Sequence, residues 1–433
     1  MAARDQMLHW DGVRAEMSSV RALEIPELEY FLNKDPKRRY TYNKPWSAGA
    51  DQTSFIVHSS GSTGNPKPLP WSHRALYKGV YEGLQHHISA PEDLKFTMLG
   101  TFHNAYMVNP LPLCWGASIF MHVHVAVMTG LVNILLPTSA PFSVPPEYMD
   151  HVTRLVPKFL PSPKPKLVLV IVPTALCSLA QDPSYVANLR DTYDTILFVG
   201  APLDYATGDA LVEQGVTIYS SLASTDAGVY PLLNVDRKDW KYLRLPPQDN
   251  PRAHGFALEH FADGDKFEVV IHRQPNEGRP CFLLNPGIDV YHTRDLWQAV
   301  PNRPGFYQGV GRVDDFVKIA SLTKFNAVEI ERGLDRNSEV IQGSLVAGDG
   351  RPKPFVIIQP TEDTRALGRE KMMDRIEGLL EQANRGVFHE VHLKRELVII
   401  TDEDKPIKRT AKGTIDRRTT LAMYQSEIDA LYS

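Results

Sequence analysis

A loop rich in glycine and hydroxyl residues, directly after a short apolar run, constrains this chain more than any other stretch. Residues 54–57 are mostly apolar and predict a strand. Residues 59–67 then place two glycines, four hydroxyl side chains and one lysine within nine positions. Glycines let successive backbone N–H groups turn towards an anion, and the hydroxyls and lysine add donors and positive charge. We therefore predict a phosphate-binding loop, to which a helix starting near residue 72 lends its N-terminal dipole.

This loop differs from the P-loop of NTPases, because Pro66, Lys67 and Pro68 stand where that pattern needs Gly, Lys and Ser/Thr. By composition alone, a plain surface turn is an equally good interpretation. The full order Ser-Ser-Gly-Ser-Thr-Gly-x-Pro-Lys is more specific. It resembles the phosphate loop of the adenylate-forming (ANL) superfamily, which includes acyl-CoA synthetases, luciferases and adenylation domains of peptide synthetases. The string from His58 to Pro68 is most similar to fungal peptide-synthetase-like enzymes and adenylate-forming reductases.

The composition is that of an ordinary globular chain, with 433 residues, 43% hydrophobic and 23% charged. This length predicts roughly two or three domains. The net charge of −4 gives no reason to expect nucleic-acid binding. The cysteines Cys114, Cys177 and Cys281 lack the spacing of metal ligands, and no secretory signal is recognised. We therefore predict buried thiols in a cytoplasmic protein.

A long stretch without charged residues, 96–146, is the one segment to compare with a membrane span. Asparagines and prolines interrupt it before it reaches the ~20 apolar residues of a spanning helix. We therefore predict no membrane span and assign the stretch to the core of the fold. His122 and His124 alternate with valines in this stretch, which favours core or strand positions over metal ligation.

Strand and helix patterns alternate over residues 166–219, which predicts a doubly wound sheet with ligands beyond the carboxyl ends of its strands. Residues 253–307 are β-rich, with Gly and Pro turns. The predicted fold class is α/β. A large N-terminal domain, residues 1–311, contains doubly wound sheets and a β-rich subdomain. Residues 312–433 form a small C-terminal α/β domain, which the resemblance implies is mobile.

Three further stretches resemble superfamily motifs in the family's own order. Gly200, Ala201 and Pro202 resemble the segment whose backbone lies against adenine. Residues 219–228 resemble the Tyr-Gly-x-Thr-Glu motif, which implies that Thr225 bonds the α-phosphate and that Asp226, in place of Glu, holds Mg²⁺. By itself this Ser-Thr-Asp string is more typical of a helix N-cap. Residues 291–297 resemble Tyr-x-Thr-Gly-Asp-Leu, which implies that Asp295 binds the ribose hydroxyls, with Arg294 in place of Gly.

Two motifs follow in the C-terminal part. Residues 311–318 match Gly-Arg-x-Asp-Asp-x-Val-Lys, which implies Arg312 near the ribose and phosphates and Asp314 as the domain hinge. Residues 407–417 resemble the terminal motif, in which the lysine at position 412 reaches between the acyl carboxylate and the α-phosphate. A basic loop alone is usually a solvated surface. The resemblance also implies that the phosphate loop binds nucleotide through Ser59, Ser60, Gly61, Thr63, Gly64 and Lys67.

His103 bears on the class of substrate. It takes the place where adenylation domains for amino acids carry an Asp that pairs with the substrate ammonium group. The resemblance therefore implies an aryl or acyl acid without an α-amino group, whereas a buried structural histidine is the alternative interpretation.

The resemblance implies ATP-dependent adenylation of a carboxylic acid to acyl-AMP, with release of pyrophosphate. Lys412, Thr225 and His103 are the catalytic candidates, and ATP/AMP and Mg²⁺ are the expected cofactors. A phosphopantetheine or CoA thiol is the acyl acceptor implied for a second step, within secondary metabolism. The residues that follow the hinge depart from the reductase-like pattern, with Leu322 in place of a glycine.

Only 58 residues precede the loop, whereas the family places a considerably longer segment there. The resemblance therefore implies that part of the large domain is missing. A small carboxylic acid is the expected partner, together with a carrier protein or a separate chain. The alternative is an inactive relative that binds nucleotide or a partner protein.

Overall fold

The computed structural model describes residues 43–59, 67–82, 91, 95, 97–111, 116–136, 144–247, 255–261, 265–275, 277–321, 323–337, 339–385, 387, 389–410 and 413–432. Five predicted site residues lie outside these ranges: Ser60, Gly61, Thr63, Gly64 and Lys412.

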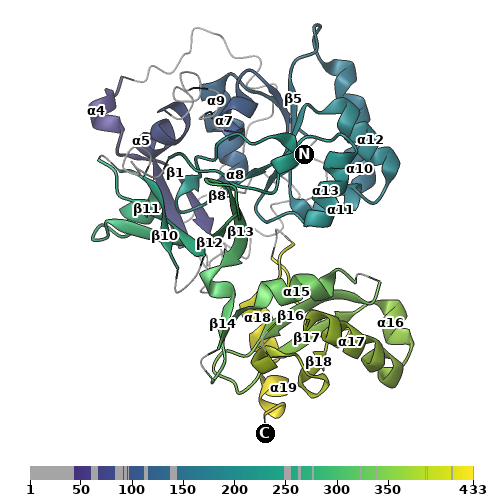
Figure 1. Ribbon diagram of the computed structural model, residues 1–433. Helices are drawn as coiled ribbons and strands as arrows, with labels where there is room; N and C mark the ends of the chain where they lie inside the picture. The colour runs from purple at the N-terminus through teal and green to yellow at the C-terminus, as the bar shows by residue number, and fades with distance from the viewer. Residues whose placement is uncertain are drawn as a thin grey trace, which may run out of the picture.

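A five-stranded parallel sheet forms the centre of the large unit (Figure 1), in the order β4-β3-β5-β6-β7. Its strands are β3 (Tyr106–Val108), β4 (Val132–Ile134), β5 (Leu167–Ile171), β6 (Thr195–Val199) and β7 (Ile218–Ser221). Every residue of β5 and β6 is buried, as expected for aliphatic strands that are covered on both faces. The predicted doubly wound arrangement is therefore confirmed.

Helices cover both faces of this sheet. One face packs against a core cluster that includes α10 (Pro146–Leu155), α11 (Pro173–Leu179), α12 (Pro183–Thr192) and α13 (Tyr205–Glu213). The other face packs against residues of α7 (Thr97–Phe102), η4 (Phe120–Val125) and α9 (Ala126–Thr129). A further short helix, α8 (Gly116–Ile119), leads into η4.

His122 and His124 lie in the helical segment η4, so their predicted place in a strand is wrong. Met121 and Val125, four residues apart, are buried on the core side of this helix. The imidazole of His122 contacts Asn133 Oδ1 (3.1 Å), and the ring of His124 stacks on Phe55. Both histidines therefore have structural contacts.

A second, antiparallel sheet contains β10 (Phe256–His260), β11 (Lys266–His272), β12 (Val290–Ala299) and β13 (Tyr307–Arg312) in sequence order. Trp297, Phe256 and Phe282 fill its core. Short elements connect the two sheets: β8 (Ala223–Ser224), β9 (Gly228–Val229) and η6 (Arg237–Asp239). A short helix, α14 (Pro280–Leu283), lies between β11 and β12. The predicted β-rich region is confirmed.

The predicted phosphate loop connects the two strands of an antiparallel hairpin, β1 (Thr53–Ser59) and β2 (Lys67–Ser72), after the short helix α4 (Trp46–Gly49). The pairing ends at Ser59 and Lys67. Helix α5 (His73–Leu76) begins after β2 and continues into η2 (Tyr77–Glu82). Residues 60–66 of the loop lie outside the described residues, so the contribution of the helix dipole to the loop stays a prediction.

The C-terminal domain is built on β16 (Ile341–Ala347), β17 (Phe355–Pro360) and β18 (Val398–Ile400) and has core clusters of its own. The hairpin β14 (Phe316–Lys318) and β15 (Lys324–Asn326) precedes it, after η8 (Val313–Asp315). Its helices are α15 (Ala327–Asp335), α16 (Glu362–Ala366), α17 (Arg369–Ala383), α18 (Arg417–Met423) and α19 (Gln425–Ala430), with short turns η9 (His389–Val391) and η10 (Arg395–Leu397).

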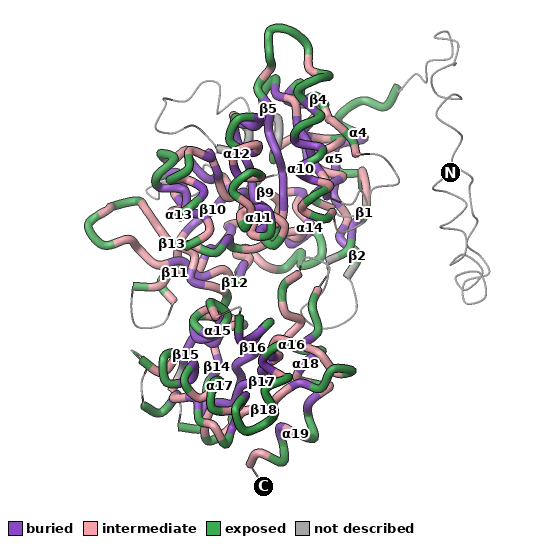
Figure 2. The backbone as a smooth tube through the Cα atoms, turned by 90° about the vertical axis from the view of Figure 1, so that its right-hand side faces the viewer, coloured by how far each residue is buried: buried purple, intermediate pink, exposed green. Residues whose placement is uncertain are grey.

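The C-terminal domain stands apart from the large unit in two views (Figures 1 and 2). In Figure 2, buried backbone, coloured purple, runs through the interior of both units. Helices α16 and α17 are separate, because Gly368 between them has a φ of 82°. In the parts of the chain that the structure describes, no helix combines the length and the apolar character that a membrane crossing requires.

Gly208 on α13 allows the helix to approach Trp240 closely. A Cβ at this position would lie 2.1 Å from Trp240 Cζ2. We expect Gly208→Ala to lower the free energy of unfolding by about 1–3 kcal/mol, the usual cost of overpacking. In contrast, a Cβ added to Gly378 on α17 would meet no atom within 4 Å, so Gly378→Ala should stabilise the protein by about 1 kcal/mol.

Thermal unfolding followed by circular dichroism measures both variants. A Gly208→Ala protein that melts at or above the temperature of the parent would contradict the packing of α13 on Trp240.

Candidate active site

The parallel sheet brings several predicted site residues to one edge. All five strands point the same way, so the segments that follow β5, β6 and β7 leave the sheet at its carboxyl edge. Thr174 follows β5, residues 200–202 follow β6, and Thr225 and Asp226 follow β7. This edge is where open α/β sheets bind ligands.

Residues 200–202 form an exposed turn between fixed neighbours. Gly200 has a φ of 90°, which a glycine adopts without strain. Leu203 is buried, and Asp204 caps α13 by accepting from Thr207 N at 2.8 Å. The turn therefore presents a well-fixed stretch of backbone, as a site for a planar ring requires.

The turn that carries Thr225 and Asp226 is held from two sides. Trp71 Nε1 donates to Thr225 O (3.2 Å), and Cys281 N donates to Asp226 O (3.0 Å). Gly228 has a φ of 83°, and a Cβ on it would lie 2.9 Å from Trp71 Cη2. The hairpin β1–β2 is therefore packed against this turn through Trp71.

Asp295 on β12 is a mostly buried carboxylate with a perturbed pKa. Its carboxylate accepts hydrogen bonds from Tyr230 Oη and from Arg312 Nη1, both at 2.7 Å. Burial raises the pKa of Asp295, while Arg312 and Tyr230 act to lower it. The pKa of Tyr230 is also raised, mainly by burial and then by the charge of Asp295. Asp295 is thus a mostly buried acceptor pre-oriented by two donors.

The backbone conformation of Arg294 explains why the Tyr-x-Thr-Gly-Asp-Leu motif carries glycine at this position. Its φ is 65°, in the left-handed region that costs a non-glycine residue about 1–2 kcal/mol. Glu268 Oε1 accepts from the backbone N–H of Arg294 at 3.0 Å and holds this conformation. The Arg-for-Gly replacement is therefore accommodated.

The loop of the terminal motif is fastened to the C-terminal domain. Arg409 donates to Gln342 O on β16 (2.9 Å) and to Gly413 O across the loop (3.0 Å). Beyond the loop, Arg417 donates to Val346 O and to Glu331 on α15. Burial raises the pKa of Glu331, and Arg417 opposes that shift.

This loop also reaches the large unit. A Cβ at Gly413 would lie 3.0 Å from Thr174 Cγ2, and Thr174 is the second residue of α11, just after the carboxyl end of β5. The neighbour of Lys412 in sequence therefore lies at the same sheet edge as residues 200–202 and Asp226. Two parts of the chain more than 180 residues apart in sequence meet there.

The structure does not bring His103 to this edge. His103 lies in an exposed turn between α7 and β3, next to Asn104, whose N–H bonds Thr129 O ahead of β4. These positions precede the strands, so they lie at the amino edge of the sheet. His103 is exposed, so the alternative interpretation of a buried structural histidine is wrong. The strand polarity places His103 at the opposite edge from residues 200–202 and Asp226, and its role beside the carboxylate pocket stays a prediction.

Some contacts of the site had no signal in the sequence. Tyr230 and Trp71 each bind a predicted site residue, but 65 and 154 positions away along the chain. Neither lies in a motif. In the described parts of the chain, no group of three or more His, Cys, Asp or Glu residues is arranged to hold a metal.

Family models identify the chain. The model described as AMP-binding enzyme matches residues 5–251, more than half of the chain. The chain belongs to the AMP-binding enzyme family. A second model, AMP-binding enzyme C-terminal domain, matches residues 314–433.

This AMP-binding enzyme resembles fungal proteins. Carboxylic acid reductase from Neurospora crassa is 25% identical over 430 residues, which cover 96% of this chain and 38% of that protein. Adenylate-forming reductase Nps10 from Heterobasidion annosum is 26% identical over 396 residues, which cover 88% of this chain and 33% of that protein. The chain thus spans well under half the length of these relatives, and the predicted resemblance is confirmed.

Solved structures support the fold. The anthranilate CoA ligase AuaEII, in complex with anthranoyl-AMP, superposes with a TM-score of 0.65 at 16% identity, covering 98% of this chain and 77% of that one. O-succinylbenzoate coenzyme A synthetase from Bacillus subtilis, in complex with AMP, gives a TM-score of 0.59 at 16% identity, covering 85% and 69%. The predicted α/β fold with a separate C-terminal domain is confirmed.

We expect Tyr230→Phe to shift the pH dependence of AMP binding. The hydrogen bond from Tyr230 lowers the pKa of Asp295, so its removal raises that pKa further. If the ionised carboxylate binds the ribose, affinity falls as pH drops through this pKa, and the variant loses AMP at a higher pH than the parent. Titrations of AMP at a series of pH values measure the shift. Tyr307→Phe, in the same sheet but away from Asp295, is the matched control. If the pH at which AMP affinity falls is the same in the variant and the parent, the role of Tyr230 is contradicted.

Proposed function

We propose that this chain adenylates a carboxylic acid: R–COO⁻ + ATP → R–CO–AMP + pyrophosphate. The observation that carries the proposal is the approach of Gly413 to Thr174. It sets the terminal-motif loop beside the carboxyl edge from which the residue 200–202 turn and the Asp226 turn emerge. A reaction between two anions needs positive charge and precise placement at one point, and Lys412, next to Gly413 in this loop, is the residue proposed to bring the charge.

The nucleotide would lie along this edge. Residues 200–202 would face adenine, and Asp295 would accept both ribose hydroxyls, since a carboxylate can accept two hydrogen bonds at once. Arg312 already contacts Asp295 and would remain beside the ribose. The groups proposed for the β- and γ-phosphates are those of the hairpin loop: Ser59, Ser60, Gly61, Thr63, Gly64 and Lys67.

Asp226 is the residue proposed to hold Mg²⁺. A lone carboxylate suits this ion, because Mg²⁺ usually takes one or two carboxylates together with phosphate oxygens and water. The fixed backbone around Asp226 supports this role, since Cys281 N holds its carbonyl. Bound Mg²⁺ would neutralise charge on the triphosphate.

The attack on the α-phosphorus requires little covalent chemistry from the chain. Thr225 would hydrogen-bond the α-phosphate, and Lys412 would bridge the attacking carboxylate and that phosphate as charge builds up. Asp314 in η8, just after β13, is the proposed hinge. Rotation there would bring the lysine in and withdraw it after the reaction.

We infer an aryl or aliphatic acid as the substrate class. The support is sequence similarity to a carboxylic acid reductase and adenylate-forming reductases. Transfer of the acyl group to a phosphopantetheine or CoA thiol is the proposed second step, with a carrier protein or a separate chain as partner.

The acid class is tested by measuring pyrophosphate release with panels of benzoic, fatty and α-amino acids. We expect turnover with members of the first two panels and none above background with the third. Turnover confined to amino acids would contradict the substrate class. If none of the acids leads to pyrophosphate release, an inactive relative that binds nucleotide is favoured.

We expect Lys412→Ala to reduce the rate of acid-dependent pyrophosphate release by about 10²–10³-fold, the cost of losing one group that stabilises transition-state charge. AMP affinity should change little, because the lysine acts on the reacting phosphate. Lys408→Ala is the matched control, since Lys408 is an exposed lysine of the same basic loop. Equal losses in the two variants would contradict the assignment.

A further inference from the structure

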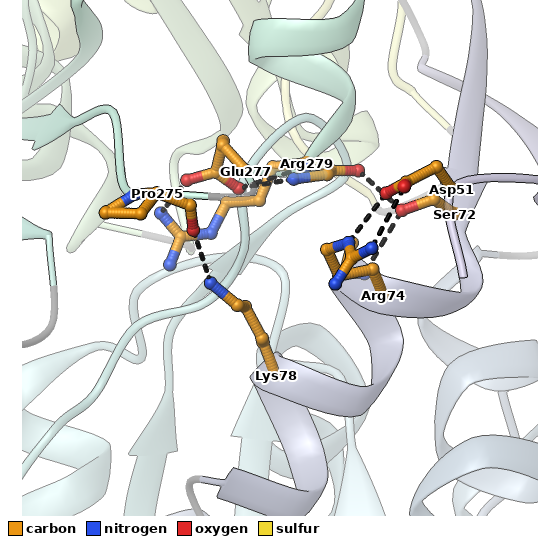
Figure 3. Close-up of polar contacts among 9 residues, drawn as sticks. Asp51, Ser72, Arg74, Lys78, Pro275, Glu277 and Arg279 are labelled. Atoms are coloured by element: carbon orange, nitrogen blue, oxygen red, sulfur yellow. Dashed lines mark hydrogen bonds and ion pairs between the residues drawn. The ribbon is translucent and has the colours of Figure 1, made fainter. Parts of the chain in front are cut away.

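A short segment between β11 and β12 holds the hairpin against the Asp226 turn. We call residues 277–281 the strap. Ser72 Oγ, at the end of β2, donates to Gly278 O (3.2 Å), and Lys78 Nζ donates to Pro275 O (2.7 Å) just before the strap (Figure 3). At its other end, Cys281 N donates to Asp226 O. The strap is therefore bonded to both segments that are proposed to hold the triphosphate.

The side chain of Glu277 fixes the backbone conformation of the strap by hydrogen bonds. Its oxygen Oε1 accepts from Gly278 N and Arg279 N, each at 3.0 Å. The other oxygen, Oε2, lies 3.5 Å from Arg279 Nη1, and the Glu277 side chain is only 5% exposed. Within the described residues, neither Oε2 nor Nη1 has a hydrogen-bond partner, so this pair is held by charge alone. A carboxylate buried this deeply is retained at a cost in solvation.

Gly278 sets how closely the strap approaches the hairpin. A Cβ at this position would lie 2.3 Å from Ser72 Oγ and 3.2 Å from Ala75 N. The same hydroxyl also caps α5 by accepting from Ala75 N at 3.1 Å. The strap therefore rests directly on the junction between β2 and α5, with no room for a side chain between them.

We propose that Glu277 is a positioning residue for MgATP. By fixing the strap, it holds the hairpin that carries the phosphate loop at a set distance from the Asp226 turn. This inference rests on the proposed function, because it assumes that the β- and γ-phosphates bind at the hairpin. ATP spans the two segments, whereas AMP lacks the phosphates that reach the hairpin. Glu277 therefore supports affinity for the triphosphate and contributes little to the affinity for AMP.

The test compares the affinities for MgATP and for AMP, each titrated calorimetrically without acid. Glu277→Ala leaves the Gly278 and Arg279 N–H groups without their acceptor, and we expect it to weaken MgATP at least about tenfold, or 1.4 kcal/mol, and AMP less than about twofold. Glu277→Gln keeps an acceptor for those N–H groups, so its loss of MgATP affinity should be smaller. Gly278→Ala pushes the strap from the hairpin without changing any charge and should reproduce the selective loss.

Asp239→Ala is the matched control. It removes another buried carboxylate of the large unit, one that binds Arg303 through two hydrogen bonds of 2.7 and 2.8 Å. We expect it to lower the melting temperature and to leave the ratio of the two affinities unchanged. This control separates a general loss of stability from a selective loss of the triphosphate.

Each outcome decides the inference. If Glu277→Ala and Gly278→Ala weaken both nucleotides equally, or weaken neither, the strap is only structural and the inference is overturned while the proposed function stands. If Glu277→Ala does not fold, Gly278→Ala and Glu277→Gln carry the same decision. If the parent protein binds neither nucleotide, the inference falls together with the proposed function.

Discussion

The shared direction of five parallel strands is the constraint on which the rest of the structure depends. Since every strand ends at the same edge, turns that lie far apart in the sequence come together there. The buried aliphatic strands β5 and β6 fix this edge rigidly. The second sheet then adds Asp295, and the C-terminal domain adds its terminal loop. The candidate site is thus a property of the sheet's polarity as much as of any single motif.

Much of the fold was predictable because its patterns are strong and local. The alternation of strand and helix over residues 166–219 was predictable, since the uninterrupted aliphatic run of β6 and the Asp cap of α13 leave little choice. Strand β2 was missed because Pro68 and Pro70 argue against a strand. An edge position in a two-stranded hairpin tolerates them. The alternating valines around His124 favoured a strand, but packing of Met121 and Val125 on the core selects a helix.

The site was predictable only where a motif names its residues. Asp226 and Asp295 were proposed from motifs, and the structure adds what holds them. Trp71 bonds the neighbouring Thr225 carbonyl and Cys281 bonds the Asp226 carbonyl, while Tyr230 and Arg312 bond the Asp295 carboxylate. These partners come from distant positions, and no periodicity or spacing in the sequence connects them. His103 was also proposed from its place in a motif, and the structure sets it at the amino edge of the sheet, away from the other candidates.

The bonds of Arg409 and Arg417 have a mechanical consequence for the terminal loop. Both ends of the loop are tied to the strands and helix of their own domain, through Gln342, Val346 and Glu331. If the domain rotates about Asp314 as proposed, these two ends of the loop would move together with it. The conformational entropy of ordering the two ends of the loop is lost once, during folding, and would not be lost again during a rotation of the domain.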